Sequence, residues 1–347
     1  NRFSSLFGEE LGSRMEFRTI NGVSARIIRA YEQRMGRNAF SLLSSEAEQT
    51  ALLRVLYFRC KGEYPTDAEL KQARTLIAYA KNQMLGKEEL DLLWKELDCF
   101  PALYRAYQQA LRNARQMDYD DQMVYAKKIL ELHEDVRTHF QNRFPYICVD
   151  EAQDTSYVQH LIVQKLVGRN GNIFMVGDED QSIYGFRGAY PAALLDFQSN
   201  YNEPCILRME TNYRSDRNIV SAANQFIKLN TRRLDKNMRA QSQKDGAIVV
   251  TCIDRMEQQA ELLLERIRNQ KPDESLAILY RNNDSAIPLI NLLQMNGIQV
   301  QTRDATGTFM TNYVIRDLLD FMLLALNPAD TTAFGHLYYK MGLYMKG

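Results

Sequence analysis

The sequence predicts two α/β units built on parallel sheets, with a helical insertion inside the first unit. Short runs rich in β-forming residues alternate with helical stretches on both sides of a polar, basic segment at 230–246, which is the spacing of βα units. Residues 45–143, before the first of these runs, show helical patterns without strand-like alternation. The 347 residues are also long for a single core.

Helices are expected to dominate the first part of the chain. At 23–35 the apolar residues recur at helical spacing, and Gly36 is a plausible stop. Residues 45–143 are rich in Leu, Ala, Gln, Glu and Lys, with Pro65 and Pro101 at expected helix starts. This block should therefore be almost wholly helical.

Alternating strands and helices are expected after this block. In the first unit the expected order is strand 146–149, helix 156–167, strand 173–178, helix 190–199, strand 205–209 and helix 215–229. The segment 230–246 is interpreted as a weakly structured linker. In the second unit the expected order is strand 247–251, helix 255–269, strand 277–281, helix 284–296 and strand 298–302.

The composition argues against several classes of protein. Hydrophobic content of 45% and charged content of 25% are typical of a folded chain rather than a disordered one. Lys plus Arg and Asp plus Glu number 43 each, so a basic surface for nucleic acid has to be local. The 5 cysteines and 4 histidines lack metal-ligand spacing, which argues against a disulfide framework and a zinc site. With no membrane-length apolar run and no signal-peptide pattern, we expect a cytoplasmic protein.

An acid cluster follows the first predicted strand, in YICVDEAQDTSYVQ (146–159). The carboxyl ends of parallel strands open onto a ligand crevice, where Asp150 can hold Mg²⁺ and Glu151 can polarise an attacking water. The alternative is an acidic helix cap, with Asp154 or Thr155 capping the next helix. The residues leave both readings open.

A second acidic strand end lies in MVGDEDQSIYGFRGA (175–189). The Gln181 amide can sense a phosphate. Tyr184, Phe186 and Arg187 lie between glycines, as in a loop that stacks bases and contacts phosphates. The alternative is a glycine-rich turn whose aromatic residues belong to the core.

A third segment, ILRMETNYRS (206–215), places Tyr213 and Arg214 after another predicted strand. The arginine can neutralise charge on a transferring phosphoryl group, and the tyrosine can stack on a purine. Alternatively, Arg214 pairs with Asp178 or Asp180. Residues 208–239 carry eight Lys or Arg against three acids, a net charge of +5, so positive charge is concentrated in this segment although the whole chain has none in excess.

These segments resemble a known family. In order and spacing, VDEAQDT, VGDEDQSIYGFRGA and NYRS are similar to motifs II, III and IV of superfamily 1 helicases of the UvrD, Rep and PcrA type. Weaker similarity covers FRTINGVSARII (17–28, motif Ib), MDYDDQMVYAKKIL (117–130), and AILYRNN, MNGIQVQ and FMTNYVIRDLLDFMLLALNP, which resemble the start of the second motor domain.

The resemblance implies a RecA-like, P-loop NTPase fold that uses ATP and Mg²⁺. It assigns Asp150 to the Mg²⁺ shell and Glu151 to water activation. It places Gln181 and Arg214 at the γ-phosphate, and Tyr213 on the adenine.

The resemblance also implies contacts to single-stranded and duplex DNA. Tyr184, Phe186 and Arg187 would line the single-stranded path, and Thr19 and Asn21 would belong to motif Ib. Two residues depart from the pattern: many members have Trp where this chain has Phe186, and His where it has Asn21. The first change preserves a ring that stacks, whereas the second puts a base contact in doubt.

The domains implied by the resemblance are three. Residues 1–44 and 116–240 would form the first motor domain (1A), 45–115 the helical insertion (1B), and 241–347 the N-terminal part of the second motor domain (2A). No GxxxxGK[ST] loop occurs, and the Gly86-Lys87 pair is followed by Glu in a helical stretch.

The missing loop and the absent initiator Met lead us to expect a piece of a longer protein. Motifs I and Ia would precede it, and motifs V and VI would follow. The piece should lack ATPase activity and leave ATP and Mg²⁺ unbound. Its parent should be an ATP-driven 3′–5′ DNA translocase and helicase of repair, replication or recombination.

Two alternatives remain open. The piece can belong to a helicase–nuclease recombination subunit. It can also be a helicase-like module without a P-loop that binds DNA or protein, although an acid pair facing an arginine argues against that reading.

Overall fold

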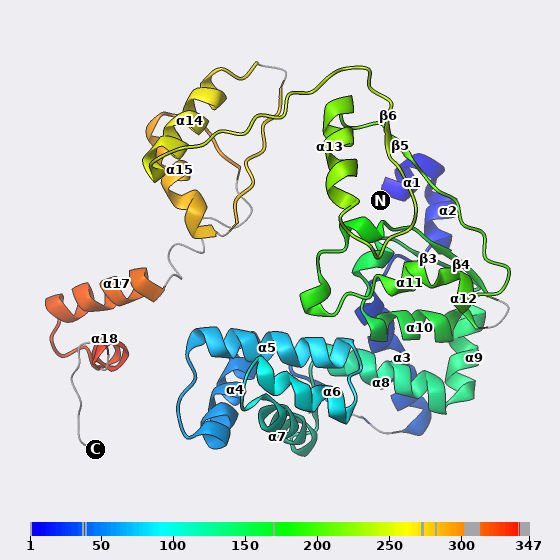
Figure 1. Cartoon of the computed structure of the whole chain (residues 1–347). Helices are drawn as coiled ribbons and strands as arrows, with labels where there is room; N and C mark the ends of the chain where they lie inside the picture. The colour runs from blue at the N-terminus through cyan, green and yellow to red at the C-terminus, as the bar shows by residue number, and fades with distance from the viewer. Residues whose placement is uncertain are drawn as a thin grey trace. The chain divides into compact units, whose positions relative to one another are not determined.

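Figure 1 shows the computed structural model of the chain, which describes residues 2–36, 38, 40–168, 171–271, 274–281, 283–301, 313–338 and 340. The chain divides into two compact units, Asn1–Ala247 and Ile248–Gly347. Each unit has buried apolar residues of its own.

Helices make up most of the first unit before its main sheet. They are α1 (Arg2–Phe7), α2 (Glu9–Arg14), α3 (Ile20–Met35), α4 (Glu46–Lys61), α5 (Asp67–Asn82), α6 (Lys87–Leu92), the 3₁₀ turn η1 (Leu93–Lys95), α7 (Phe100–Asn113), α8 (Tyr119–Leu132) and α9 (Glu134–Arg143). Two short strands, β1 (Ser41–Leu42) and β2 (Gln116–Met117), pair in parallel. One precedes α4–α7 and the other follows them, so the pair closes the helical block. The prediction of this block is confirmed.

Helix α3 begins and ends where local chemistry predicts. The Thr19 hydroxyl caps it by accepting a hydrogen bond from the Gly22 amide at 3.1 Å. Gly36 ends it in the left-handed region at φ 61°, which glycine adopts without a steric penalty. The predicted helix is confirmed, although it starts earlier, at Ile20.

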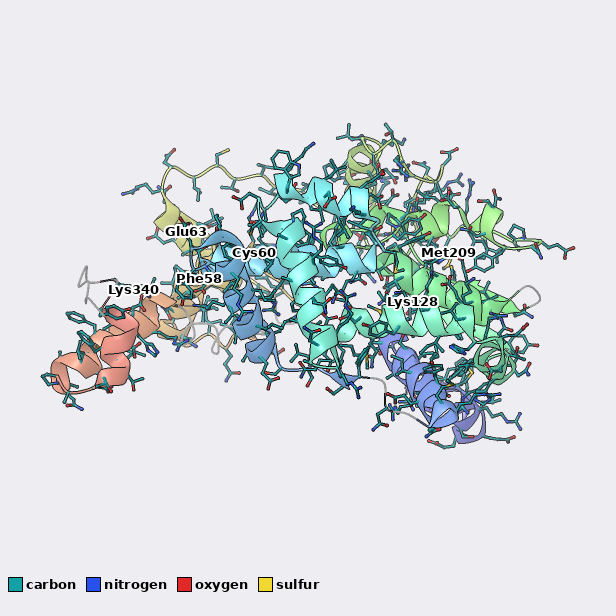
Figure 2. The ribbon with its side chains drawn as sticks, turned by 90° about the horizontal axis from the view of Figure 1, so that it is seen from below. Phe58, Cys60, Glu63, Lys128, Met209 and Lys340 are labelled. Carbon is teal, nitrogen blue, oxygen red and sulfur yellow. The ribbon has the colours of Figure 1, made fainter. Side chains whose placement is uncertain are left out.

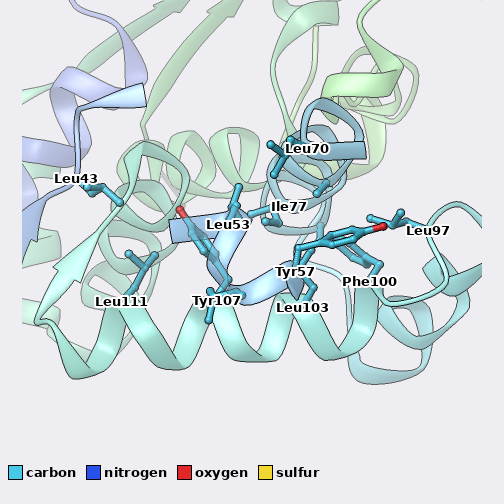
Figure 3. Packing of buried hydrophobic residues seen from close by; sticks show 13 residues of the cluster. Leu43, Leu53, Tyr57, Leu70, Ile77, Leu97, Phe100, Leu103, Tyr107 and Leu111 are labelled. Atoms are coloured by element: carbon cyan, nitrogen blue, oxygen red, sulfur yellow. The ribbon is translucent and has the colours of Figure 1, made fainter. Parts of the chain in front are cut away.

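The helical block α4–α7 has its own core, shown in Figure 3. Seven of its residues are at most 1% exposed: Leu53, Tyr57, Ala73, Ile77, Phe100, Leu103 and Tyr107. They come from α4, α5 and α7, which therefore share an interior of their own.

A second core joins the helices that support the main sheet. It contains Ile27, Met123, Ala126, Leu130, Val136, Phe140, Val158, Ile162 and Leu166 from α3, α8, α9 and α10 (Tyr157–Val167). The parallel strands β3 (Tyr146–Val149) and β4 (Asn172–Met175) pack Ile147 against this cluster. On the other face, Tyr146 and Phe174 are 74% and 61% exposed. The predicted strand–helix–strand unit is confirmed.

Short elements complete the first unit. They are η2 (Ala152–Asp154), η3 (Glu179–Gln181), η4 (Gly185–Arg187), α11 (Ala192–Leu195), α12 (Phe197–Asn200), β5 (Thr211–Asn212), α13 (Arg217–Ile227) and β6 (Arg239–Ala240). The strand predicted at 205–209 is wrong, because this run has no pairing partner; its Met209, labelled in Figure 2, is 83% exposed. Instead, β5 and β6 pair in parallel.

A buried ionic cluster joins α5 to the start of α8. The Lys81 ammonium lies 2.6 Å from Asp118 Oδ2 and 2.9 Å from Asp121 Oδ1, and the Lys81 side chain is 2% exposed. Asp118 also caps α8, since its Oδ1 accepts from the Asp121 amide at 2.8 Å. The cluster fixes the helical block to the helix that leads into the main sheet.

Asp120 borders this cluster and has an unusual pKa. Burial, and then the charge of Asp118, raises the pKa of Asp120 to about 6. Since this pKa lies above that of an unfolded Asp, the stability from this group is present in acid and is lost as pH rises from about 4 to about 6.

The Asp120→Asn variant has no carboxyl group at this position, so it should not show this loss of stability. The unfolding free energy of the variant relative to wild type is expected to grow by on the order of 2 kcal/mol between pH 4.5 and 7 in urea titrations.

An exposed carboxylate provides the control for this titration. Asp91 pairs with Arg105 at 3.1 Å, and its side chain is 46% exposed. Asp91→Asn removes an exposed carboxylate from a pair that contributes little to stability, and its pH profile is the comparison for Asp120→Asn. A parallel profile for Asp120→Asn would contradict the assignment.

The second unit is helical in its described part. Its helices are α14 (Met256–Arg268), α15 (Asn283–Met295), α17 (Tyr313–Leu326) and α18 (Thr331–Leu337). Helix α14 packs against α15, and α17 against α18. The helices predicted at 255–269 and 284–296 are confirmed.

The strands predicted for the second unit are not formed in the described residues. Neither 247–251 nor 277–281 pairs with another strand, and Val250 and Leu279 are 86% and 97% exposed. The third predicted strand, 298–302, is also unpaired in its described residues, 298–301. Residue 302 of that predicted strand lies outside the described residues, as do residues 282 and 309–312 of the segments that resemble the second motor domain. Within the described ranges, none of the helices combines the length and apolar character needed to cross a membrane.

Candidate nucleotide and DNA site

The acid pair follows β3 directly and lies at the surface. Asp150 and Glu151 are both exposed, and Asp150 Oδ1 accepts a hydrogen bond from the Glu151 amide at 3.0 Å. Glu151 has φ 49° and ψ 45°, in the left-handed region, which costs a non-glycine residue about 1–2 kcal/mol. Such strain persists where surrounding contacts hold it, and it clusters at functional sites.

Gln153 is the contact that holds Glu151. It is 2% exposed, donates from Nε2 to Glu151 Oε2 at 2.7 Å, and accepts at Oε1 from the Asp178 amide at 3.0 Å. Its carbonyl accepts from the Ser182 hydroxyl at 3.1 Å. One buried residue therefore joins the acids after β3 to the segment after β4. No role was predicted for Gln153 from the sequence. Only its position two residues after Glu151 could have indicated one.

Gly177 allows this close approach of the two strand ends. A Cβ at this position would lie 2.6 Å from Gln153 Oε1, 2.8 Å from Leu194 Cδ1 and 3.1 Å from the Ala152 nitrogen. No side chain fits there without displacing the amide that holds Glu151.

The alternative that Asp154 or Thr155 caps helix α10 is wrong. Ser156 is the N-cap residue, and its amide donates to Gln159 Oε1 at 3.0 Å. Asp154 Oδ1 is buried without a hydrogen-bond partner in the described part of the chain. Burial, and then the charge of Glu151, raises the pKa of Asp154.

Gln181 lies in η3, beside the end of β4. Its Nε2 donates to Asp178 Oδ2 at 2.7 Å, and the residue is exposed. Asp178 Oδ1 accepts from the Asp180 amide at 3.2 Å. This bond fixes the plane of the Gln181 amide, and a contact of its second N–H or its oxygen with a phosphate stays a prediction.

A basic clip, Arg233 and Lys236, covers the acids of η3. Arg233 binds Asp180 bidentately, with Nε 3.0 Å from Oδ1 and Nη2 2.7 Å from Oδ2. The Lys236 ammonium contacts Asp178 and lies 2.9 Å from Glu179 Oε2. The segment 230–246 is weakly structured as predicted, apart from the two-residue strand β6. It is not a free linker in this part, however, because its cations are bound to the acids of the first unit.

The clip and the acids compensate one another's charge. Burial tends to raise the pKa of Asp178, but hydrogen bonds from Lys236 and Gln181 outweigh it and hold that pKa below its usual value. The carboxylates of residues 178–180 lie close enough to share a cation, with ligand atoms within 4.8 Å. An ammonium and a guanidinium already occupy that role, so we assign no metal to them.

Asp150 suits the predicted magnesium ion better. Among the described residues, the Glu151 amide is the only hydrogen-bond donor to its carboxylate. The residue is exposed, and a carboxylate can hold Mg²⁺ directly or through water. The Asp150 carboxylate is thus a suitable magnesium ligand, and an ion at this residue stays a prediction.

Tyr184, Phe186 and Arg187 form an exposed group, called the aromatic stack below for the bases that it could stack. The two ring centroids are 6.3 Å apart with their planes tilted by 51°, and the guanidinium carbon lies 5.4 Å from each of them. Tyr184 is 39% and Phe186 58% exposed, so neither ring is a buried core residue. Aromatic faces beside a positive charge are the groups that bind single-stranded nucleic acid.

Tyr213 and Arg214 follow β5 in a turn. Asn212 Oδ1 accepts from the Arg214 amide at 2.9 Å, and Tyr213 is 76% exposed. The alternative pairing of Arg214 with Asp178 or Asp180 is wrong, because the basic clip binds those acids. In the described residues no ion pair joins the Arg214 side chain to the acid pair.

Thr19 and Asn21 lie at the start of α3. The Thr19 hydroxyl is used as the helix cap. Asn21 Oδ1 is buried and has no hydrogen-bond partner among the described residues. A DNA contact by either residue stays a prediction.

Two family models match the chain. The UvrD/REP helicase N-terminal domain matches residues 1–202, and the UvrD-like helicase C-terminal domain matches residues 207–344.

Curated relatives agree with these matches. The ATP-dependent DNA helicase PcrA of Leuconostoc citreum is 29% identical over 346 residues, covering 96% of this chain and 45% of the relative. The putative ATP-dependent DNA helicase YjcD of Bacillus subtilis is 31% identical over 279 residues, covering 79% and 36%. The ATP-dependent DNA helicase Rep of Buchnera aphidicola is 31% identical over 306 residues, covering 86% and 46%. The chain spans less than half the length of each of these relatives.

Proposed function

The chain belongs to the UvrD/Rep family of helicases, and on this premise we propose that it is part of an ATP-dependent DNA helicase motor. The motor would move 3′ to 5′ along single-stranded DNA and separate duplex DNA. Helicase domains of this family imply a RecA-like α/β fold, with which a helix-rich chain carrying small parallel sheets is consistent.

We assign the domains as the motifs suggest. Residues 1–44 and 116–240 are the first motor domain, 45–115 the insertion, and 241–347 the beginning of the second motor domain. The β1–β2 pair, which closes the helical block at 41–42 and 116–117, supports the insertion boundaries.

The observation that carries the proposal is the bonded path from the acid pair to the aromatic stack. Glu151 is bound to Gln153, Gln153 to the Asp178 amide, and Asp178 to Gln181. The aromatic stack begins three residues after Gln181. One short segment would thus contact the nucleotide at one end, through Gln181, and stack the DNA bases at the other.

In the ATP reaction, Glu151 would orient the attacking water and accept its proton. Gln153 holds this carboxylate in place, so the base is positioned before the water arrives. Asp150 would hold the magnesium ion, which when bound neutralises charge on the β and γ phosphates. Gln181 and Arg214 would contact the γ-phosphate, and Tyr213 would stack on the adenine.

The chain as given is proposed to be inactive as an ATPase. Its sequence has no GxxxxGK[ST] loop, and such a loop supplies both the backbone cradle and the lysine for the phosphates. DNA binding would thus be retained by this chain, whereas ATP turnover would require the whole motor.

Single-stranded DNA binding tests the proposed function in the chain itself. Phe186→Ala removes one ring of the aromatic stack, and the Kd for a labelled oligo(dT) is expected to rise about tenfold, because one base–aromatic stack contributes about 1–3 kcal/mol. Fluorescence anisotropy measures the Kd. Phe58→Ala is the matched control, since Phe58 stacks on Tyr64 at 4.6 Å and is 41% exposed, and no described cation lies over either of these rings. Figure 2 labels Phe58. Equal Kd values for both variants and wild type would refute the DNA-binding role.

A further inference from the structure

The last residues of α5 and the residue after it hold two different parts of the first unit. Lys81 is bound by Asp118 and Asp121 in the buried ionic cluster. Asn82 donates to Asp120 at 2.8 Å. These contacts fix the C-terminal turn of α5 on α8, so the following residue has a defined position.

Gln83 uses that position to hold the loop that carries the aromatic stack. Its Nε2 donates to the Gly188 carbonyl at 2.8 Å, across 105 residues of sequence. Gly188 has φ +87°, and a Cβ on it would lie 2.7 Å from the Asn82 Cβ. The loop therefore passes directly over the end of α5, at a place where a side chain on the glycine would not fit.

Gly188 also controls the conformation of the stack itself. Its amide donates to the Gly185 carbonyl at 2.9 Å, and the Arg187 amide donates to the Tyr184 carbonyl at 2.9 Å. These bonds form the single 3₁₀ turn η4, which carries Phe186 and Arg187 and has Tyr184 as its N-cap residue. On its other side the loop is fixed to the main sheet region, because the Tyr190 amide donates to the Thr155 carbonyl at 2.8 Å.

We propose that Gln83 is a positioning residue for single-stranded DNA binding. It acts through Gly188, and the buried Lys81 keeps it in place, so the helical block sets the geometry of the aromatic stack. This inference rests on the proposed binding of DNA by that stack. Without the Gln83 bond the loop is held at one side only, and the rings lose part of their preorganisation.

The test replaces Gln83 by Met, which keeps the length of the side chain and removes the donor. The Kd for labelled oligo(dT) is expected to rise about fivefold, the effect of losing one neutral hydrogen bond. Gln72→Met is the matched control, because Gln72 lies on the same helix and donates to the Glu96 carbonyl at 2.7 Å. This control should bind as wild type, and both variants should keep the wild-type melting temperature within about 2 °C.

A double variant separates positioning from general weakening. If Gln83 acts through the stack, Gln83→Met added to Phe186→Ala should bring little further loss of affinity. If the increase in Kd of the double variant equals the product of the increases for the two single variants, the inference is overturned.

A single tryptophan reports on the loop without DNA. Trp94 is the only tryptophan, so Trp94→Phe with Phe186→Trp places one fluorophore in the stack. Adding Gln83→Met should shift its emission, whereas Gln72→Met should not. If Phe186→Ala weakens binding but Gln83→Met neither weakens it nor shifts the emission, the inference fails and the proposed function stands. If Phe186→Ala itself has no effect, the proposed function fails.

Discussion

Replacing Lys81 by Met is expected to lower the unfolding free energy of the first unit by about 3–5 kcal/mol. Lys81 is 2% exposed at its side chain and is the cation between Asp118 and Asp121. Met fills a similar volume, but both carboxylates remain buried without a counter-charge. The Tyr107 hydroxyl donates to Asp118 at 3.0 Å, so it stabilises the charge of that carboxylate in part, but it donates no hydrogen bond to Asp121. Urea denaturation followed by circular dichroism measures the loss.

The control for Lys81 breaks an exposed ion pair. Arg105 lies 3.1 Å from Asp91, with side chains 62% and 46% exposed. Exposed pairs contribute about 0–1 kcal/mol, so Arg105→Met should be nearly neutral. A loss for Lys81→Met no larger than that for Arg105→Met would show that the buried cluster does not stabilise the junction of α5 and α8.

Glu151→Gln is expected to lower DNA-stimulated ATP turnover by at least about a hundredfold in the whole helicase motor proposed above. The glutamine oxygen can still accept the bond that Gln153 donates, so the local geometry should survive. The amide cannot take a proton from water, however, and the reaction loses its base. Steady-state phosphate release measures kcat, and ATP binding should change little.

Glu203 provides a matched control for this variant. It is an exposed glutamate with φ 48°, close to the backbone conformation of Glu151, but it lies after α12 and away from the acid pair in sequence. Glu203→Gln should leave turnover unchanged. Turnover by Glu151→Gln equal to that of this control would remove Glu151 from the mechanism.

Helices were predicted better than strands, and the reason is physical. A helix such as α3 satisfies its hydrogen bonds within one segment and is bounded by Thr19 and Gly36, so its signals are local. A strand needs a partner from elsewhere in the chain. The run at 146–149 has one in β4, whereas 205–209 has none and stays unpaired.

The positions of the candidate site residues in the fold were predicted in part, and their roles stay predictions. The acid pair, Gln181 and the aromatic stack follow strands in short segments, so their places could be inferred from the sequence. Their supporting contacts could not, because they depend on tertiary packing. Gln153 differs from any surface glutamine only in its burial, and Lys81 meets Asp118 from 37 residues away.

The basic clip changes where an autonomous first unit can end. A truncated polypeptide that stopped at residue 229, just after α13, would keep η3 but lose both cations that bind its acids. Three carboxylates at 178–180 would then face one another uncompensated, and aggregation or local melting would follow at the segment that carries Gln181. A polypeptide that extends through β6 at Ala240 keeps Arg233, Lys236 and the β5–β6 pair. Charge balance at residues 178–180 therefore favours an end beyond the last helix of the unit.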